Sequence, residues 1–191
     1  MLLAIDFLLP LLAVTATGVD DEARFPYWEV RDNDVSIRFV QRLPDQTRAF
    51  FLARGFKLNQ IESAAQSCVF QTIVRNTSTK AAPATLTYNL RDWVIHAGGA
   101  KHKMKTREDW KPVHEASGVS PPARLAFDWA LFPTRQEYNA GDYGWGMSVF
   151  GLKPGTRFDL DLVWQQDGRP RRVRLKGIEC APDIHPEPSA E

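Results

Sequence analysis

The chain has 191 residues and a formal net charge of +1 at pH 7, and 43% of its residues are hydrophobic. This length and apolar fraction suit a single domain with a sizeable core. The nearly neutral charge gives no reason to expect nucleic acid, an anionic membrane or an acidic partner.

Residues 1–16 form an apolar segment that ends in the small-residue sequence V-T-A, a pattern typical of signal-peptide cleavage. The segment is too short to span a bilayer comfortably, so no stable membrane span is expected. It has no basic residue, and Asp6 interrupts it; the alternative is a buried N-terminal strand or helix of a cytosolic protein. We therefore expect a periplasmic or secreted protein, with residues 17–27 as a linker after cleavage.

Two short apolar runs on either side of Asn33 predict one strand or a hairpin. Residues 44–67 instead predict a helical hairpin. Pro44 suits a first helical turn, and Gly55 suits a left-handed stop. A second short helix is expected to begin at Asn59, which has a glutamate three residues later.

Strands are expected over residues 68–75 and 85–95, which are rich in β-branched and aromatic side chains. Residues 96–120 are polar and basic. Thr106 is a candidate helix cap in this segment, but Pro112 is expected to limit the helix to about one turn or to force a restart.

Residues 124–132 and 157–164 alternate between apolar and other side chains, which predicts two strands with one buried face each. The expected inward side chains are Leu125, Phe127, Trp129, Leu131, Phe158, Leu160, Leu162 and Trp164. The D-G pair at Asp167 predicts a tight hairpin, and Gly177 predicts a bulge. Residues 181–191 are proline-rich and acidic, and we expect a disordered tail there.

These patterns together predict a mainly β fold, an antiparallel β-sandwich that is immunoglobulin-like in the broad sense. The single domain is expected over residues 28–180, with the short helical hairpin inserted at residues 44–67 over one open end or edge.

The 2 cysteines, Cys68 and Cys180, lie far apart, each at the end of an expected strand. In an exported chain they are expected to form one disulfide, whereas in the cytosol they would be two buried thiols. The chain has no cysteine pair with zinc spacing, so no structural zinc site is expected.

Two histidines and a methionine, His96, His102 and Met104, form a candidate copper site, which Met147 could complete from a later loop. Imidazole and thioether ligands suit Cu(I), which prefers soft donors. The alternative is a solvated basic loop, because lysines flank His102 on both sides and repel a cation.

Residues 133–147 form a glycine- and aromatic-rich stretch that is a second candidate site. Long loops between sandwich strands usually carry function or cover the end of the core. The candidate ligand or partner residues in it are Gln136, Tyr138, Asp142, Tyr143 and Trp145. In the alternative, Tyr143 and Trp145 close the end of the core.

No phosphate-binding, dinucleotide-binding or nucleophile-elbow motif is present in the sequence. We therefore expect no enzyme and no nucleic-acid partner. The leading hypothesis is an exported binding or accessory protein that holds copper in its His/Met loop. The alternative is a non-metal module that binds a protein, a glycan or another small ligand through residues 133–147.

Overall fold

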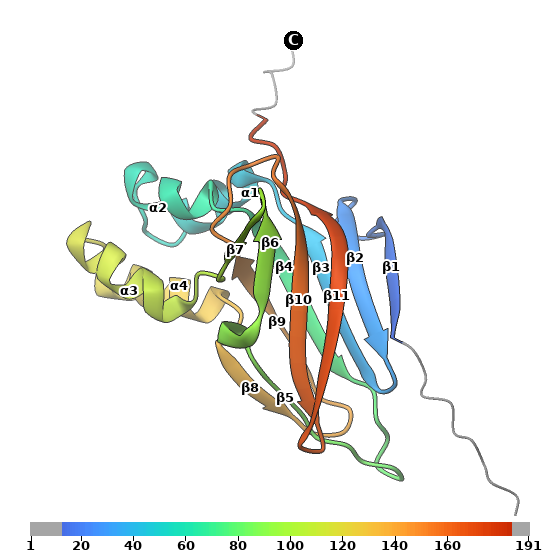
Figure 1. Cartoon of the computed structure of the whole chain (residues 1–191). Helices are drawn as coiled ribbons and strands as arrows, with labels where there is room; N and C mark the ends of the chain where they lie inside the picture. Colours follow the sequence, from blue (N-terminus) through green and yellow to red (C-terminus); the bar gives the residue numbers. More distant parts are fainter. Residues whose placement is uncertain (1–12, 185–191) are drawn as a thin grey trace, which may run out of the picture.

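The computed structural model describes residues 13–184, and over these residues the chain forms two antiparallel sheets with four helices gathered at one end (Figure 1). The expected antiparallel β-sandwich is confirmed. The main core lies between the two sheets and contains large side chains from both, among them Phe39, Phe70, Trp93 and Trp164.

The first sheet has five strands in the order β1-β2-β3-β4-β9. Their bounds are β1 (Val14–Val19), β2 (Pro26–Asp32), β3 (Val35–Gln41), β4 (Val69–Asn76) and β9 (Tyr143–Val149). β2 and β3 form the hairpin predicted at Asn33, whose positive φ of 48° suits the turn. Residues 14–19, which we assigned to the leader and the linker, instead form an exposed edge strand paired with β2. Residues 1–12 of the candidate signal peptide lie outside the described residues.

The second sheet is built around the long strand β10 (Arg157–Gln166). β11 (Arg169–Glu179) pairs with β10 on one side, and β6 (Val94–Ala97) and β5 (Leu86–Asn89) pair with it on the other. The outer neighbours are β7 (Ala100–His102) and β8 (Arg135–Tyr138). The hairpin at Asp167 and the bulge at Gly177 are both confirmed. The strand predicted over residues 85–95 is broken by a short helical turn, η1 (Leu90–Asp92), between β5 and β6.

The helices are α1 (Pro44–Leu52), α2 (Leu58–Ala65), α3 (Arg107–Ala116) and α4 (Pro121–Ala130). The predicted helical hairpin is confirmed in α1 and α2, although α2 begins one residue before Asn59, after an N-cap at Lys57. Helix α3 begins after Thr106 as expected, but it continues through Pro112 for ten residues, so the predicted limit of one turn is wrong. A proline inside a helix removes one hydrogen bond, and packing of Trp110 and His114 in the cluster below the helix offsets that loss.

The strand predicted at residues 124–132 is wrong, because this segment is mostly helix α4. Two prolines precede it and are pre-organised for a first helical turn, and Ala123 and Phe127 then fall four residues apart on one buried face. Leu125 and Trp129 share the opposite face and are 50% and 78% exposed. A short apolar run fits both the two-residue period of a strand and the 3.6-residue period of a helix. Here the contacts with the other helices decide in favour of the helix.

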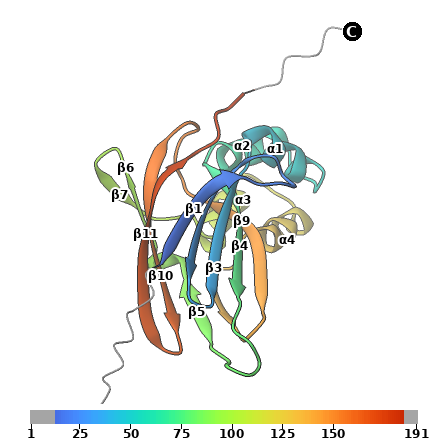
Figure 2. The ribbon, with the colours of Figure 1, turned by 90° about the vertical axis from the view of Figure 1, so that its right-hand side faces the viewer.

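A second apolar cluster joins the helices to the outer face of the first sheet. The helices lie at one end of that sheet only (Figures 1 and 2). In it, Phe51, Ile61, Trp110 and Phe127 pack together, and the cluster extends to Val69, Met147 and Val149 on β4 and β9. The rest of that outer face, beyond Met147, is therefore not covered by helices.

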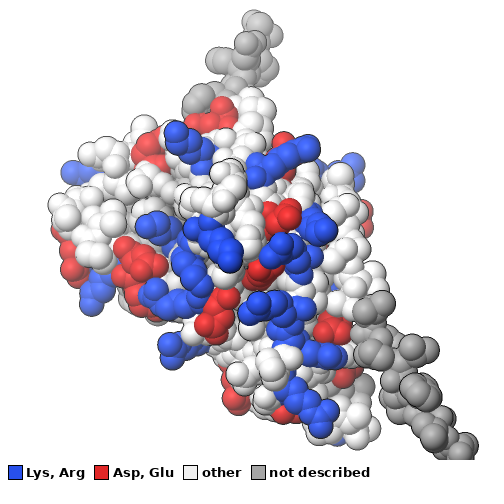
Figure 3. Space-filling view, viewed as in Figure 1, with Lys and Arg blue, Asp and Glu red and all other residues white. Residues whose placement is uncertain are grey.

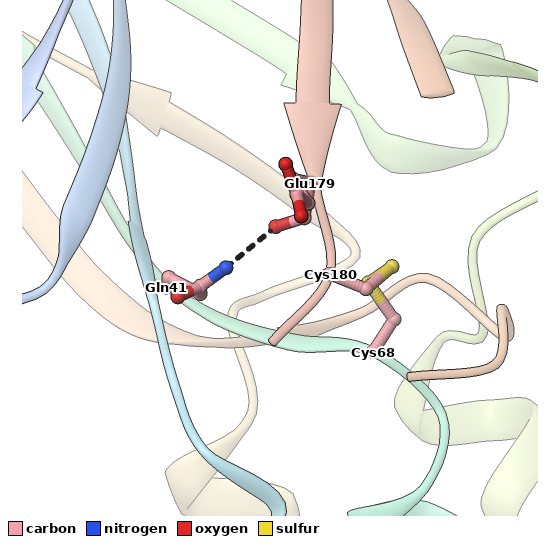
Figure 4. The surroundings of a disulfide bond; sticks show 4 residues. All are labelled: Gln41, Cys68, Glu179 and Cys180. Carbon is pink, nitrogen blue, oxygen red and sulfur yellow. Dashed lines mark hydrogen bonds between the residues drawn. A yellow bond between two sulfur atoms is a disulfide. The ribbon is translucent and has the colours of Figure 1, made fainter. Parts of the chain in front are cut away.

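The predicted disulfide is confirmed. Cys68 and Cys180 are joined, and the bond connects the start of β4 to the end of β11 (Figure 4). Beside it, the side-chain amide of Gln41 donates to the carbonyl oxygen of Glu179 at 2.9 Å. The bond thus joins the two sheets at the end where the helices lie.

The first residues of the expected disordered tail are ordered, since Ala181 is buried and Asp183 pairs with Arg48 at 2.8 Å. Residues 185–191 lie outside the described part of the chain.

Candidate ligand-binding face

The four residues of the predicted copper site do not converge. Residues directly opposite each other in an antiparallel pair point to the same side of the sheet. His96 is opposite Lys101, whereas His102 is opposite the buried Ile95, so the two imidazoles lie on opposite sides of the second sheet. Met104 is buried in the main core, and Met147 is buried in the separate cluster below the helices.

His96 also has other partners. Its Nε2 atom lies 2.8 Å from a carboxylate oxygen of Asp161, which also accepts a hydrogen bond from Arg174 at 2.8 Å. Hydrogen bonds from Arg174 and then His96 outweigh burial and hold the pKa of Asp161 well below its usual range. The imidazole is therefore part of an ion-paired group on the outer face of the second sheet.

His102 and Met104 do line one shallow pocket, but three cationic side chains, those of Arg91, Lys103 and Lys105, line it against the single carboxylate of Asp109. This concentration of positive charge opposes a bound cation. Residues 13–184 contain no group of three or more His, Cys, Asp or Glu side chains placed to hold a metal ion. Copper binding through these residues stays a prediction from the sequence.

The second candidate site divides into buried and exposed residues. Tyr138 is buried and stacks on Tyr88 in the main core. Asp142 accepts a hydrogen bond from the backbone of Asn139 at 2.8 Å and so holds the turn before β9. Gln136 is exposed on β8, in the other sheet. The predicted loop is therefore two strands and a turn, and its residues do not form one site.

Tyr143 and Trp145 are the exception, because they are 61% and 65% exposed on β9. The alternative in which they close the end of the core is therefore wrong. They are two residues apart on one strand, so both point to the outer face of the first sheet, just beyond the part that the helices cover.

The strand register places a row of side chains beside each of these aromatic residues. Trp145 is opposite Ile73, which is opposite Arg38, which is opposite Glu29. One step along the strands, the row is Tyr143, Arg75, Ser36 and Arg31. We call these eight residues the binding face. They come from β2, β3, β4 and β9, and all point outward.

The binding face is hollow. A pocket of about 410 Å³ lies over it and is lined mainly by Glu29, Arg31, Arg38, Ile73 and Arg75. A second pocket, of about 460 Å³, shares Arg38, Ile73 and Arg75 and is bounded by the turn at residues 20–23. The two pockets meet over Arg38 and Ile73, so the hollow extends across the sheet.

Glu29 fixes the charged centre of this face. It is only 3% exposed and accepts hydrogen bonds from Arg31 at 3.0 Å, Ser36 at 2.7 Å and Arg38 at 3.0 Å. Burial alone would raise the pKa of its carboxyl group, but the hydrogen bonds outweigh it and lower the pKa below its usual range. Glu29 is thus ionised at neutral pH and holds two guanidinium groups in place.

Arg38 and Arg75 differ in how they are held. The Arg38 guanidinium lies 4.2 Å from the ring centroid of Tyr27 and also pairs with Asp20 at 3.2 Å. The Arg75 guanidinium lies 5.4 Å from the ring centroid of Tyr143. Within residues 13–184, no carboxylate pairs with Arg75. Arg75 therefore offers a cation beside an exposed aromatic ring.

Sequence reasoning identified the two aromatic residues but missed the charged residues of the face. A usable signal was present, because Ser36 and Arg38 alternate with apolar residues on a strand that was predicted. Arg75 also ends the predicted strand at residues 68–75. The sequence did not show that these strands are neighbours of β9.

No helix within the described part of the chain is long and apolar enough to cross a bilayer. Comparison with known proteins adds no identification: no family model, no curated protein and no solved structure matches this chain.

Proposed function

We propose that this is an exported binding module that holds a glycan against the outer face of the first sheet, with sugar rings stacked on Trp145 and Tyr143. The observation that carries the proposal is the pair of exposed aromatic rings beside a hollow, charged face. The proposal refines the second of the two hypotheses drawn from the sequence.

The aromatic pair suits stacked rings. Large aromatic side chains bury much apolar area on contact and lose little conformational freedom. Residues two apart on a strand are about 7 Å apart, which lets Tyr143 and Trp145 contact successive rings of an oligosaccharide. The C–H face of a sugar ring is apolar and can pack against each aromatic face.

The centre of the face suits a glycan, because its polar groups match those of a sugar. Here the centre contains Glu29, Arg38 and Arg75, which are donors and acceptors that match the hydroxyl groups of a sugar. Ion pairing holds the first two in place before a ligand arrives, which lowers the entropy lost on binding.

The disulfide supports an exported location, because such bonds persist in oxidising compartments and are rare in the cytosol. A binding module outside the cytoplasm would meet polysaccharides of the cell surface or the surroundings.

Isothermal titration with neutral oligosaccharides of the gluco and manno series tests the proposal. We expect Trp145→Ala to weaken binding about tenfold or more, because truncation of an aromatic anchor costs about 2 kcal/mol. Leu58→Ala, which also removes an exposed apolar side chain but on helix α2, is the control and should bind as the wild type does. Equal affinity of Trp145→Ala and the wild type would contradict the proposal.

A further inference from the structure

We infer that the glycan is acidic and that a uronic acid residue binds at the Tyr143 end of the binding face, with its carboxylate paired to Arg75. This inference rests on the proposed function and names its ligand class. It comes from the distribution of charge along the hollow.

Positive charge exceeds negative charge at the Tyr143 end. The pocket there is lined by three arginines, Arg31, Arg38 and Arg75, and by one carboxylate, Glu29. Glu29 is shared between Arg31 and Arg38, so Arg75 is left without a carboxylate partner among the described residues. A carboxylate of the ligand can therefore pair with this guanidinium group without breaking an existing ion pair.

The other polar groups at this end are hydroxyl and amide groups, those of Ser36, Asn33 and Thr77. Ser36 donates to Glu29 and Asn33 donates to Asp32, so the selectivity for an anion comes from Arg75. Guanidinium binds a carboxylate through two parallel hydrogen bonds, a geometry that a hydroxymethyl group does not match. The pocket therefore distinguishes a uronic acid from the neutral sugar of the same configuration.

The opposite end of the hollow repels an anion. The second pocket shares Arg38 and Arg75 with the first, but it is also lined by Asp20, Asp21 and Glu22 from the turn before β2. Of these three carboxylates, only Asp20 has an ion-pair partner, Arg38, among residues 13–184. An anionic sugar is thus directed away from this turn and towards Arg75. The acidic ring stacks on Tyr143, and a neighbouring ring stacks on Trp145.

Matched tetrasaccharides test the inference because they differ only in the group at one carbon of each ring. We would titrate mannotetraose against the mannuronate tetramer of the same linkage, and cellotetraose against its glucuronate counterpart. We expect the acidic member of at least one pair to bind about three- to tenfold more tightly at low salt, as for a partly exposed bidentate ion pair. This preference should shrink at about 0.5 M salt, where the charges are screened.

The variant that isolates the ion pair is Arg75→Gln, which should weaken binding of the acidic member about three- to tenfold more than binding of the neutral one and so remove the preference. The matched control is Arg172→Gln, an exposed arginine of β11 in the second sheet. Figure 3 looks onto the side where β10 and β11 lie, and Lys and Arg there are interspersed with Asp and Glu. The control should therefore keep the preference.

The outcomes separate the two proposals. Equal affinity for acidic and neutral tetramers, with both weakened by Trp145→Ala, would overturn the uronic acid inference and keep the glycan-binding proposal. A preference that survives Arg75→Gln would also overturn the inference. Acidic binding that is lost in Arg75→Gln but unaffected by Trp145→Ala would keep the anion site and overturn stacking. Failure of every tetramer to bind would overturn both.

Discussion

Mild acid should destabilise the protein through one buried imidazole, that of His114. This residue lies on α3, is only 2% exposed, and its ring centroid is 4.4 Å from that of Phe127 and 5.2 Å from that of Phe56. Its Nε2 atom has no hydrogen-bond partner among the described residues. Burial, and secondly the charge of Arg124, lower its pKa to about 4 from 6.5.

Proton binding by the folded and the unfolded chain determines whether acid raises or lowers the stability. Because the folded-state pKa of His114 is the lower one, the unfolded chain takes up a proton first as the pH falls below 6.5. The contribution of neutral His114 to the free energy of unfolding is therefore complete above pH 6.5, and it is lost progressively as the pH falls from 6.5 to about 4. The full loss is about 3 kcal/mol, of which about 2 kcal/mol is already lost at pH 5.

Urea unfolding at about pH 7 and about pH 5 measures this effect, since this interval lies above the usual pKa values of the carboxyl groups. In His114→Phe, which keeps a ring of similar size, the free energy of unfolding should change between the two pH values by about 2 kcal/mol less than in the wild type. His102→Ala, which removes an exposed imidazole, is the control and should behave as the wild type. An undiminished pH dependence in His114→Phe would refute the reasoning.

Three other changes follow from the fold. Reduction of the disulfide, whose cysteines are 112 residues apart, should lower the free energy of unfolding by about 5 kcal/mol on the chain-entropy model. Urea unfolding with and without reductant measures this loss, and equal unfolding midpoints would contradict the prediction. Gly146→Ala should lower stability by about 1–3 kcal/mol, because a Cβ atom there would lie 2.7 Å from the backbone nitrogen of Phe132; an unchanged melting temperature would show that this backbone moves freely. Removal of His102 should leave the affinity for Cu(I) unchanged in a competition titration, and a tenfold loss would restore the predicted His/Met site.

The glycine at position 146 illustrates what the sequence could not show. It lets the segment after α4 approach β9 closely, and the backbone of Phe132 donates a hydrogen bond to the carbonyl oxygen of Met147 at 2.8 Å. The sequence marked a glycine-rich stretch there, but a flexible loop and a close backbone approach have the same composition.

Local patterns determined the elements whose signals depend on near neighbours. The alternation at residues 157–164 predicted a strand whose inward side chains are buried, and the D-G pair at Asp167 predicted its hairpin. The same kind of alternation failed at residues 124–132, because a short apolar run fits a helix as well, and only packing against the other helices decides between the two.

The candidate site depended on the tertiary structure, because its residues meet only through strand pairing. Trp145 and Arg75 are 70 positions apart in the sequence, as their numbers show, and they share a face because β9 pairs with β4 in one particular register. The register likewise placed His96 and His102 on opposite sides of the second sheet. A shift of one residue would reverse the side to which each side chain points, and the sequence of a single strand does not specify that register.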